Sequence, residues 1–410
     1  MPDKLISANI ILSDRSTWSY LLPLTHTRPV ADIRIGLRTI KEKWEEFCCG
    51  TISYHTETYL APKYPLLYEE NNLIINASLL PESEIVDHIN TLQENEALYF
   101  ENHFLAARIS QKINDPEDLS VLLSSCKTVP YHPTTPPQLL LRPWNILTLL
   151  TKETLSDIHF LSHNRVSQKL SDTNRIIGDH PVFIEEGAKA ECAVFNTTNG
   201  PIYLGKNSEV MEGSLIRGPF ALGEGSTVNM GAKIYGPVAV GPKCKIGGEI
   251  KGTQFFGNAN KGHEGFVGDS IIGEWCNLGA DTNTSNLKNN YLPVRVWSYV
   301  EEKFVDTGLQ FCGLIMGDHS KTGINTMFNT GTVTGAYCNI FGEGYPRNFI
   351  PSFAWGGGSG FQTHPLKKAL ETATIVFARR NFLLTEEDKD IAGAINEQTA
   401  HSRVWEKKDL

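Results

Sequence analysis

The densest group of polar residues in the chain lies between residues 251 and 286. Its members at fixed offsets are Lys251, His263, Gly268, Asp269, Asn277 and Asn286. Histidine is the side chain whose ordinary pKa lies closest to neutral pH, so His263 is of the type that exchanges protons in catalysis. Lysine adds a positive charge and asparagine adds amide hydrogen bonds. The group therefore indicates a site for the chemistry of a polar small molecule.

The segment that must position these residues has a hydrophobic period of six. The aliphatic residues at this period are Leu204, Val210, Ile216, Leu222, Val228, Ile234, Val240 and Ile246. Neither an amphipathic helix nor simple strand alternation gives a period of six. A repeated short strand and corner does, with three faces to a coil of eighteen residues. We therefore predict a parallel β-helix over residues 182–362, in which the aliphatics point inward and stack about 4.8 Å apart.

The period is interrupted after Ile246 and resumes at Ile272 and Leu278, and again near Ile324. We predict that the intervening residues form loops thrown out from the corners of the coil. The polar group thus lies where the regular repeat fails.

The repeat resembles that of the left-handed β-helix acyltransferases, and this resemblance supplies the handedness, an exception to the usual right-handed crossover. Residues 251–286 resemble the acetyltransferase half of the bifunctional N-acetylglucosamine-1-phosphate uridylyltransferases. The resemblance implies an acetyl-CoA acyl donor and a general-base role for His263, which would take a proton from an attacking sugar amine. It also implies a homotrimer with active sites between subunits.

By the same resemblance, Lys251 would bind the sugar phosphate together with Lys233, eighteen residues earlier and one coil below. The family has Arg at the position of Lys233, so the two-pronged guanidinium contact is lost. Asn277 and Asn286 would hydrogen-bond the sugar or the acyl group. Phe266 stands where the family often has Tyr, which removes one hydroxyl contact.

Each of these residues also has a purely structural interpretation. His263 taken alone would be a surface histidine, and only its offsets to the other members of the group favour catalysis. Lys233 and Lys251 could be solvated charges. Asn277 and Asn286 could be corner residues, since Asn tolerates the left-handed backbone conformation.

A second polar stretch, residues 317–325, resembles the Gly-Asp-x-x-Lys-Thr-Gly-Ile-Asn run of archaeal bifunctional sugar-phosphate nucleotidylyltransferase/acetyltransferases. In that family such runs lie late in the coil, near the pantetheine arm of coenzyme A. The resemblance makes His319 and Lys321 candidate cofactor contacts, with structural turns as the alternative.

The N-terminal part has alternating strand and helix patterns, with a strand at 5–12, a helix at 35–47 and strands at 73–77 and 97–100. These patterns predict an α/β domain with a doubly wound sheet. The segments 23–29 and 143–147 resemble sugar-1-phosphate nucleotidylyltransferases, which share Pro-Leu-Thr, Arg-Pro and a later Pro-Trp motif.

The phosphate-binding features of those relatives are altered in this chain. Residues 13–19 contain no Gly, although the family uses glycines to free backbone N–H groups for the triphosphate. Asn76 stands where the family has a metal-binding Asp, and a neutral amide is a weak Mg²⁺ ligand. Arg15 and Arg28 are the expected phosphate contacts. Mg²⁺ with a nucleoside triphosphate remains one hypothesis, and a domain that only binds sugar nucleotide is the other.

Composition limits the other classes of function. The chain has 37 basic and 46 acidic residues, a net charge of -9 and no basic block, which argues against a nucleic-acid partner. No apolar run suggests a membrane span or a secretion signal, so we expect a cytoplasmic protein. Its eight cysteines lack the spacing of a metal site.

The resulting prediction is a four-part chain. Residues 1–165 form the nucleotidyltransferase-like α/β domain, 166–181 a linker, 182–362 the β-helix and 363–410 a cap of two helices, one including Lys367–Arg379 and one starting after Thr385. The predicted function is sugar-1-phosphate nucleotidyl transfer joined to CoA-dependent N-acyl transfer onto an amino-sugar phosphate. The alternatives are a non-catalytic trimeric scaffold that binds sugar nucleotides, and nucleotidyl transfer alone with a β-helix that only trimerises.

Overall fold

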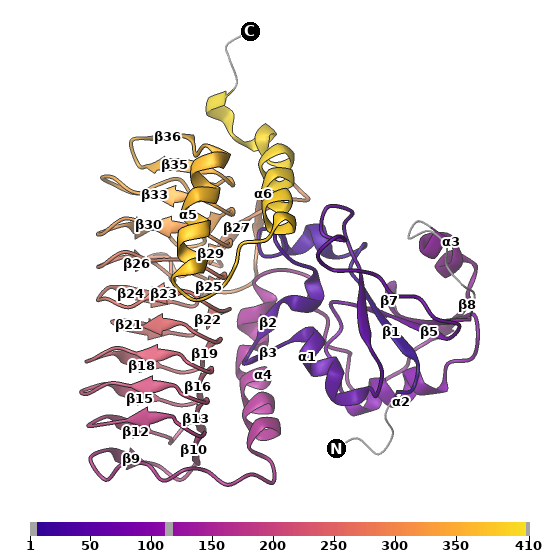
Figure 1. Cartoon of the computed structure of the whole chain (residues 1–410), viewed down its shortest axis with the longest axis horizontal. Helices are drawn as coiled ribbons and strands as arrows, with labels where there is room; N and C mark the ends of the chain where they lie inside the picture. Colours follow the sequence, from indigo (N-terminus) through magenta and orange to yellow (C-terminus); the bar gives the residue numbers. More distant parts are fainter. Residues whose placement is uncertain (1–5, 111–117, 407–410) are drawn as a thin grey trace. The chain divides into compact units, whose positions relative to one another are not determined.

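The computed structural model describes residues 6–110 and 118–406 (Figure 1). They divide into two compact units. Unit 1 contains the described residues up to 21, together with 27–33 and 38–141, and unit 2 contains 22–26, 34–37 and 142 onward. Residue 5, where the first predicted strand begins, and residues 407–410 of the predicted cap lie outside the described residues.

Unit 1 is built on a six-stranded sheet with the order β4-β1-β5-β7-β6-β8. Its strands are β1 (Asn9–Ser13), β4 (Ile52–His55), β5 (Asn72–Asn76), β6 (Glu96–Phe100), β7 (His103–Ile109) and β8 (Lys127–Pro130). A further short strand of unit 1, β3 (Arg38–Thr39), lies outside this sheet. Its helices are α1 (Ile40–Trp44), α2 (Ser83–Thr91) and α3 (Asp118–Ser125). β4, β1 and β5 are parallel, whereas β7 is antiparallel to both of its neighbours. The predicted α/β class is confirmed.

The helix predicted over residues 35–47 begins later than the pattern suggested. Thr39 accepts a hydrogen bond from the backbone N–H of Glu42, and the Glu42 carboxylate accepts one from the Thr39 N–H. This reciprocal capping box satisfies two free helix N–H groups, so α1 starts at Ile40.

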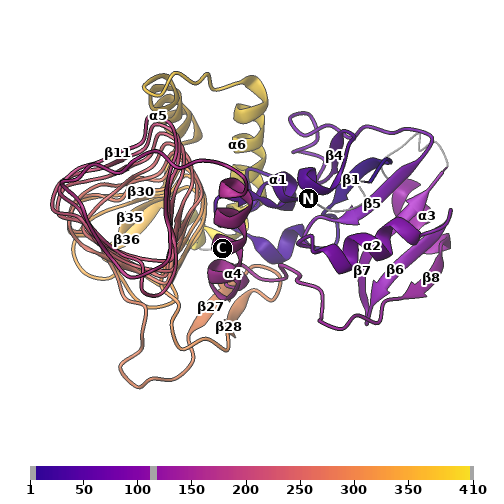
Figure 2. The same cartoon turned by 90° about the horizontal axis from the view of Figure 1, so that it is seen from below.

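Unit 2 is a parallel β-helix with three faces, seen along its axis in Figure 2. Face 1 contains β10 (Val182–Ile184), β13 (Ile202–Leu204), β16 (Phe220–Leu222), β19 (Val238–Val240), β22 (Gln254–Phe255), β25 (Ile271–Ile272), β29 (Ile315–Met316), β32 (Val333–Thr334) and β34 (Phe349–Ile350). Face 2 contains β11 (Lys189–Ala190), β14 (Glu209–Val210), β17 (Thr227–Val228), β20 (Lys245–Ile246), β23 (Asn260–Lys261), β30 (Lys321–Thr322), β33 (Asn339–Ile340), β35 (Ala354–Gly357) and β36 (Gly360–Thr363). Face 3 contains β9 (Arg175–Ile177), β12 (Val194–Asn196), β15 (Leu215–Arg217), β18 (Lys233–Tyr235), β21 (Glu249–Lys251), β24 (Phe266–Gly268), β26 (Asn283–Thr284) and β31 (Met327–Phe328).

The predicted interior of the β-helix is confirmed. All eight aliphatics of the six-residue period are at most 1% exposed. Leu204 pairs with Leu222, and Leu222 with Val240, in the register of adjacent coils. The predicted parallel β-helix is therefore confirmed, and its left-handedness follows from the family resemblance. The coil begins earlier than residue 182, with β9 inside the predicted linker.

The first interruption of the period is a shortened coil, and the prediction of an ejected loop there is wrong. Val240 pairs with Phe255 and Ile246 with Lys261, each only fifteen residues later. The residues missing from this coil come from its turns, where Gly247 and Gly248 make a tight corner between β20 and β21.

The second interruption is a true insertion. Ile271 pairs with Ile315, and the residues between them include the antiparallel hairpin of β27 (Arg295–Ser298) and β28 (Lys303–Asp306). The period then resumes in a different phase from the predicted one. Ile324 is 71% exposed, and the buried inward position is taken by Thr322, which pairs with Ile340.

Helix α4 (Asn145–Ser162) groups with the β-helix, although the sequence suggested that the N-terminal domain continues to residue 165. It packs against strands of face 1, where Ile158 lies in a cluster with Phe183 and Tyr203. Asp157 on α4 accepts a hydrogen bond from the Leu37 N–H at 2.8 Å, which joins the segment containing β2 (Arg34–Ile35) to the same unit.

The C-terminal helices form where predicted, α5 over Leu366–Ala378 and α6 over Glu386–Gln398. The sequence led us to expect that they cap the open coil or pack on a neighbouring subunit. Instead α5 doubles back along the outside of the coils (Figure 1), and its Phe377 ring stacks on Trp275 with a centroid distance of 4.0 Å. Trp405, after α6, packs against Phe361 in the final hairpin of the coil.

Candidate functional site

His263 lies on the corner between β23 on face 2 and β24 on face 3, with an exposed side chain. The three backbone carbonyls of this corner are all fixed. Gly262 accepts from the Asn229 side chain at 2.7 Å, and His263 and Glu264 accept from the Lys261 ammonium at 2.5 and 3.0 Å. The corner therefore presents the imidazole outward from a rigid backbone.

Lys261, which the sequence analysis missed, occupies an inward position of the coil, paired with Ile246. It is 1% exposed, and burial lowers its pKa to about 8. The sequence contains a signal for this buried lysine, because Phe255, Lys261 and Val267 follow one another at six-residue intervals. In the structure all three side chains are buried. A lysine at an aliphatic position of a hydrophobic period indicates a buried charge with a specific task.

The shortened corner of the preceding coil lies directly against the His263 corner. A Cβ atom on Gly248 would lie 2.7 Å from the His263 carbonyl oxygen, and one on Gly247 would lie 2.6 Å from the Gly262 oxygen. Gly248 also has a φ of +70°, which L side chains rarely adopt. Only glycine allows the two corners to approach so closely.

The prediction that Lys233 lies directly below Lys251, one coil away, is wrong. Because the coil between them is short, Lys233 pairs with Glu249, whereas Lys251 pairs with Tyr235. Lys233 forms an ion pair with Glu264, next to His263, at 3.1 Å. Both lysines still lie on face 3, at opposite ends of its strands.

The other end of β24 carries a second polar cluster. Asn286 donates to the Asp269 carboxylate at 2.6 Å, and burial raises the pKa of Asp269. The ammonium of Lys251 lies 4.6 Å from the Phe311 ring centroid. Gly268 has no room for a side chain, because a Cβ there would meet the Phe266 ring and the Asn286 amide. The structure thus brings Lys251 and Asn286 together beside β24.

Asn277 lies on face 2, separate from this cluster. It pairs with Asn260 below and Lys321 above, and the Asn260 amide donates to its side-chain oxygen at 2.6 Å. It lines a cavity of about 620 Å³ between face 2 and α5. The cations around this cavity are Lys243, Lys245, Lys321, Arg379 and Arg380.

His319 belongs to an aromatic ladder along the corner between faces 1 and 2. The ladder consists of Trp275, His319, Tyr337 and Phe353, which all have φ between +58° and +61°. The rings of His319 and Tyr337 are 4.5 Å apart and nearly parallel, and Phe377 of α5 packs on the ladder. His319 is therefore buried, and the Lys321 ammonium donates to its carbonyl at 2.9 Å. Burial lowers the pKa of Lys321. The roles of both residues toward a cofactor stay predictions.

In unit 1, polar residues meet at the carboxyl ends of β1 and β4. Ser13 and His55 are hydrogen-bonded at 2.8 Å. Asp14, also missed by the sequence analysis, is fully buried, and burial raises its pKa to about 7. One of its oxygens accepts from the Val30 N–H and the Thr56 hydroxyl at 2.8 and 3.0 Å. These two hydrogen bonds of Asp14 therefore hold the loop that follows β1 in place.

The predicted phosphate contacts of unit 1 are both engaged with the protein. Arg15 pairs with Glu57 at 3.6 Å, and Arg28 is buried at 7% exposure. The Asn76 side chain donates to the Phe104 carbonyl and accepts from Ser78. Since Asn76 is committed to this turn and Asp14 is buried with a raised pKa, these donors do not fit Mg²⁺. Across residues 6–110 and 118–406, no three His, Cys, Asp or Glu side chains gather in a way that could hold a metal.

Unit 1 is thus an α/β domain and unit 2 a parallel β-helix, and the proteins to which the chain is similar are transferases. Residues 10–166 match the family described as sugar nucleotidyl transferase. A bifunctional sugar-1-phosphate nucleotidylyltransferase/acetyltransferase of Sulfurisphaera tokodaii is 26% identical over 386 residues, which cover 78% of this chain and 92% of that protein. The resemblance drawn from the sequence is confirmed.

Two further similarities cover less of the chain or are more distant. The bifunctional protein GlmU of Methanocaldococcus jannaschii is 41% identical over 92 residues, and the chain spans only 22% of that relative's length in the match. The match to the structure of LpxA, a UDP-N-acetylglucosamine acyltransferase from Bacteroides fragilis, covers 59% of this chain and 86% of the LpxA chain. The sequence identity is 15% and the TM-score is 0.35. Within the described part of the chain, no helix is long and apolar enough to cross a membrane.

Proposed function

We propose that the β-helix transfers an acyl group from an acyl-CoA, with acetyl-CoA as the first candidate, to the amine of an amino-sugar phosphate. The observation that carries this proposal is that β24 has His263 and Lys233 at one end, at a corner whose backbone is held rigid, and Lys251 at its other end. The Sulfurisphaera relative, which is named for both nucleotidyl and acetyl transfer, supports the same assignment.

In the proposed step, the His263 imidazole accepts a proton as the amine nitrogen attacks the thioester carbonyl. The new C–N bond forms, the C–S bond breaks, and the coenzyme A thiolate leaves with the proton from the imidazolium. Lys251 and Lys233 hold the sugar phosphate by charge, and Asn286 hydrogen-bonds the sugar or acyl group. In this role a sugar phosphate would have to compete for Lys233 with its surface partner Glu264.

The acyl donor is assigned to the cavity of face 2. Its five cations suit the phosphates of coenzyme A, and Lys321 and Asn277 line it, whereas His319 lies in the adjoining aromatic ladder. In one chain, Asn277 and Lys321 lie on face 2 while Lys251 and Asn286 lie beside face 3. We therefore propose a homotrimer, in which face 2 of one subunit completes the site beside face 3 of the next.

The test is release of free thiol from acetyl-CoA with glucosamine-1-phosphate as acceptor. We expect activity in the parent protein and a loss of at least 100-fold in His263→Ala, the range of a missing general base. His180→Ala, which changes an exposed histidine of the first coil, serves as the matched control. Unchanged transfer in His263→Ala would remove the assignment. A protein inactive with every amino-sugar phosphate and acyl donor would favour the scaffold alternative.

Sugar-1-phosphate nucleotidyl transfer by unit 1 is a second candidate, favoured by the family match over residues 10–166. We expect Arg28 and Arg15 to contact phosphate if the reaction occurs. Pyrophosphate release from UTP or dTTP with a sugar-1-phosphate would support it. Binding of sugar nucleotide without pyrophosphate release would instead indicate that unit 1 only binds its ligand.

A further inference from the structure

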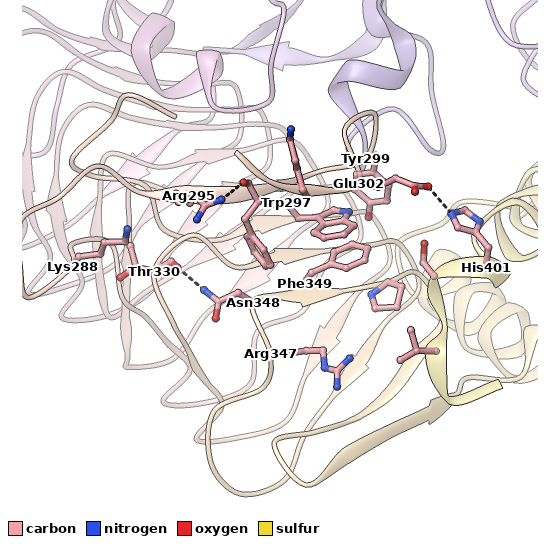
Figure 3. A pocket seen from close by; sticks show the side chains of 15 residues that line it. Lys288, Arg295, Trp297, Tyr299, Glu302, Thr330, Arg347, Asn348, Phe349 and His401 are labelled. Atoms are coloured by element: carbon pink, nitrogen blue, oxygen red, sulfur yellow. Dashed lines mark hydrogen bonds and ion pairs between the residues drawn. The ribbon is translucent and has the colours of Figure 1, made fainter. Parts of the chain in front are cut away.

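A cavity of unit 2 lies beside the inserted hairpin (Figure 3), and no residue of the His263 corner lines it. Its volume is about 1120 Å³. It is bounded by β27 and β28, by the segment leading into β34, and by residues 401–404 after α6. None of the residues assigned to acyl transfer lines it.

Aromatic rings form one wall of this cavity. Trp297 of β27 and Phe349 of β34 are stacked, with centroids 4.3 Å apart and planes at 11°. The rings of Phe304 and Trp297 form a T-shaped pair with centroids 5.5 Å apart. The rings of Tyr299 and Phe349 form a second T-shaped pair at the same centroid distance. Arg295 and Trp297 of β27, and Tyr299 just after it, alternate with the buried residues Val296 and Ser298, and their side chains line the cavity.

Positive charges surround the aromatic wall. The Lys and Arg residues that line the cavity are Lys288, Arg295, Lys303 and Arg347. Glu302 is the one acidic residue among its lining residues, and it lies 3.8 Å from His401. The whole chain has a net charge of -9, so this concentration of cations is local and not a general property of the surface. The cavity therefore has a potential that attracts anions.

Two of these cations are held in place by the protein, and two are left for a ligand. Arg295 donates to the Phe304 carbonyl at 2.5 Å, and Lys288 donates to the Pro293 carbonyl at 2.8 Å. Lys303 begins β28 and Arg347 lies in the loop before β34, and both residues are exposed where they line the cavity. A guanidinium and an ammonium in these places suit the oxygens of a diphosphate.

We propose that this cavity binds a nucleoside diphosphate group, with the phosphates at Arg347 and Lys303 and the base against the aromatic wall. The cavity has room for a ligand of that size, since its volume of about 1120 Å³ is slightly above the roughly 300–1,000 Å³ typical of small-molecule pockets. Aromatic side chains bind any base by its ring surface, and the cations add the phosphate charge. A free nucleotide and the adenosine diphosphate end of coenzyme A share this chemistry. None of the residues assigned to acyl transfer lines this cavity, so its binding can be tested separately from that function.

The test is isothermal titration of the full chain with UDP, ADP and coenzyme A, alongside uridine and inorganic pyrophosphate. We expect at least one diphosphate ligand to bind, and its Kd to rise at least tenfold in the double variant Arg347→Ala, Lys303→Ala and in Trp297→Ala. Lys189→Ala, which changes an exposed lysine that lines neither cavity, should leave that Kd unchanged. Binding should also weaken as NaCl is raised from about 50 to about 500 mM, because salt screens exposed charges.

The arms of the titration separate the possible outcomes. Preference for UDP assigns the site to a free nucleotide, whereas preference for ADP and coenzyme A would place the acyl donor here instead of in the cavity of face 2. Both support the proposal. Wild-type affinity in both the double variant and Trp297→Ala would overturn it, because the nucleotide would then bind elsewhere, as in unit 1. Failure of all three diphosphate ligands to bind, or equal affinity for pyrophosphate and uridine alone, would also overturn it. Melting temperatures within about 2 °C of the parent show that the variants are folded.

Discussion

The ammonium of Lys261 donates a hydrogen bond of 2.5 Å to the backbone carbonyl of His263. It does so from inside the β-helix, at a position where the adjacent coil has Ile246. A lysine therefore occupies one inward position of the hydrophobic repeat, and its ammonium fixes the corner that carries the proposed base. This relationship makes stability and the proposed activity depend on the same buried charge.

Lys261→Met should change how stability varies with pH. Burial lowers the folded-state pKa of Lys261 to about 8, whereas an unfolded lysine titrates near 10.5. Between these values the unfolded chain binds more protons, so this lysine makes stability rise with pH from about 8 to 10.5, by roughly 3 kcal/mol. Urea unfolding at pH 7.5 and 10 should show that rise in the parent relative to Lys261→Met. Lys245→Met, an exposed neighbour on face 2, should behave as the parent, and equal pH profiles for all three proteins would contradict the prediction.

Asp14→Asn should show the opposite dependence in unit 1. Burial raises the folded-state pKa of Asp14 to about 7, against an ordinary value of 3.8, so the folded chain binds the extra proton between these values. The contribution of Asp14 to the free energy of unfolding is fully present below about pH 4. It falls by roughly 4 kcal/mol as the pH rises through 7. Asn keeps an oxygen that can accept from Val30, and should remove this dependence. The measurement is the difference in unfolding free energy between parent and variant from pH 4.5 to 7.5, and a constant difference would refute the assignment.

Gly248→Ala should destabilise the chain more than Gly231→Ala. Both glycines have φ near +70°, so both substitutions bear the same backbone strain of roughly 1 kcal/mol. A methyl group on Gly248 would lie 2.7 Å from the His263 oxygen, while one on Gly231 would meet nothing within 4 Å. We expect an additional loss of about 1–3 kcal/mol for Gly248→Ala from this overlap. Urea midpoints measure it, and equal losses would show that the His263 corner moves aside freely.

Phe377→Ala should detach α5 from the aromatic ladder. Phe377 is 8% exposed and stacks on Trp275, so its removal should cost about 3 kcal/mol and shift the Trp emission to longer wavelength. Ile375→Ala is the control, because Ile375 lies on the same helix and is 63% exposed. A loss no greater than that of the control would mean that the ladder is stable without α5.

The architecture of unit 2 could be read from the sequence because its cause is local. A short strand, a corner and an inward aliphatic recur every six residues, and each coil needs only its neighbour to bury that aliphatic. The same holds for α6, whose Thr385 and Asp388 cap it within a single turn. The type and approximate position of these elements follow from contacts between residues near in sequence.

The candidate site was predicted in its members but not in its arrangement. The sequence indicated His263, Lys233, Lys251, Asn277 and Asn286, yet the coil that passes from Val240 to Phe255 is three residues short of the full eighteen. Whether missing residues leave a loop or a tighter corner depends on how two coils approach each other in space. Gly247 and Gly248 permit that approach, and the register change moves Lys251 opposite Tyr235 instead of Lys233.

By itself, the sequence determined the β-helix, its inward residues and the family to which its motifs are similar. Only the tertiary structure decided that Lys261 lies inside the coil, that α5 covers a ladder of aromatic corners, and that a basic aromatic cavity forms beside the hairpin. Periodicity reports which residues avoid water, because that preference is repeated along the chain. A buried lysine, a helix that doubles back and a cavity depend on partners far apart in sequence, and only the folded chain brings these together.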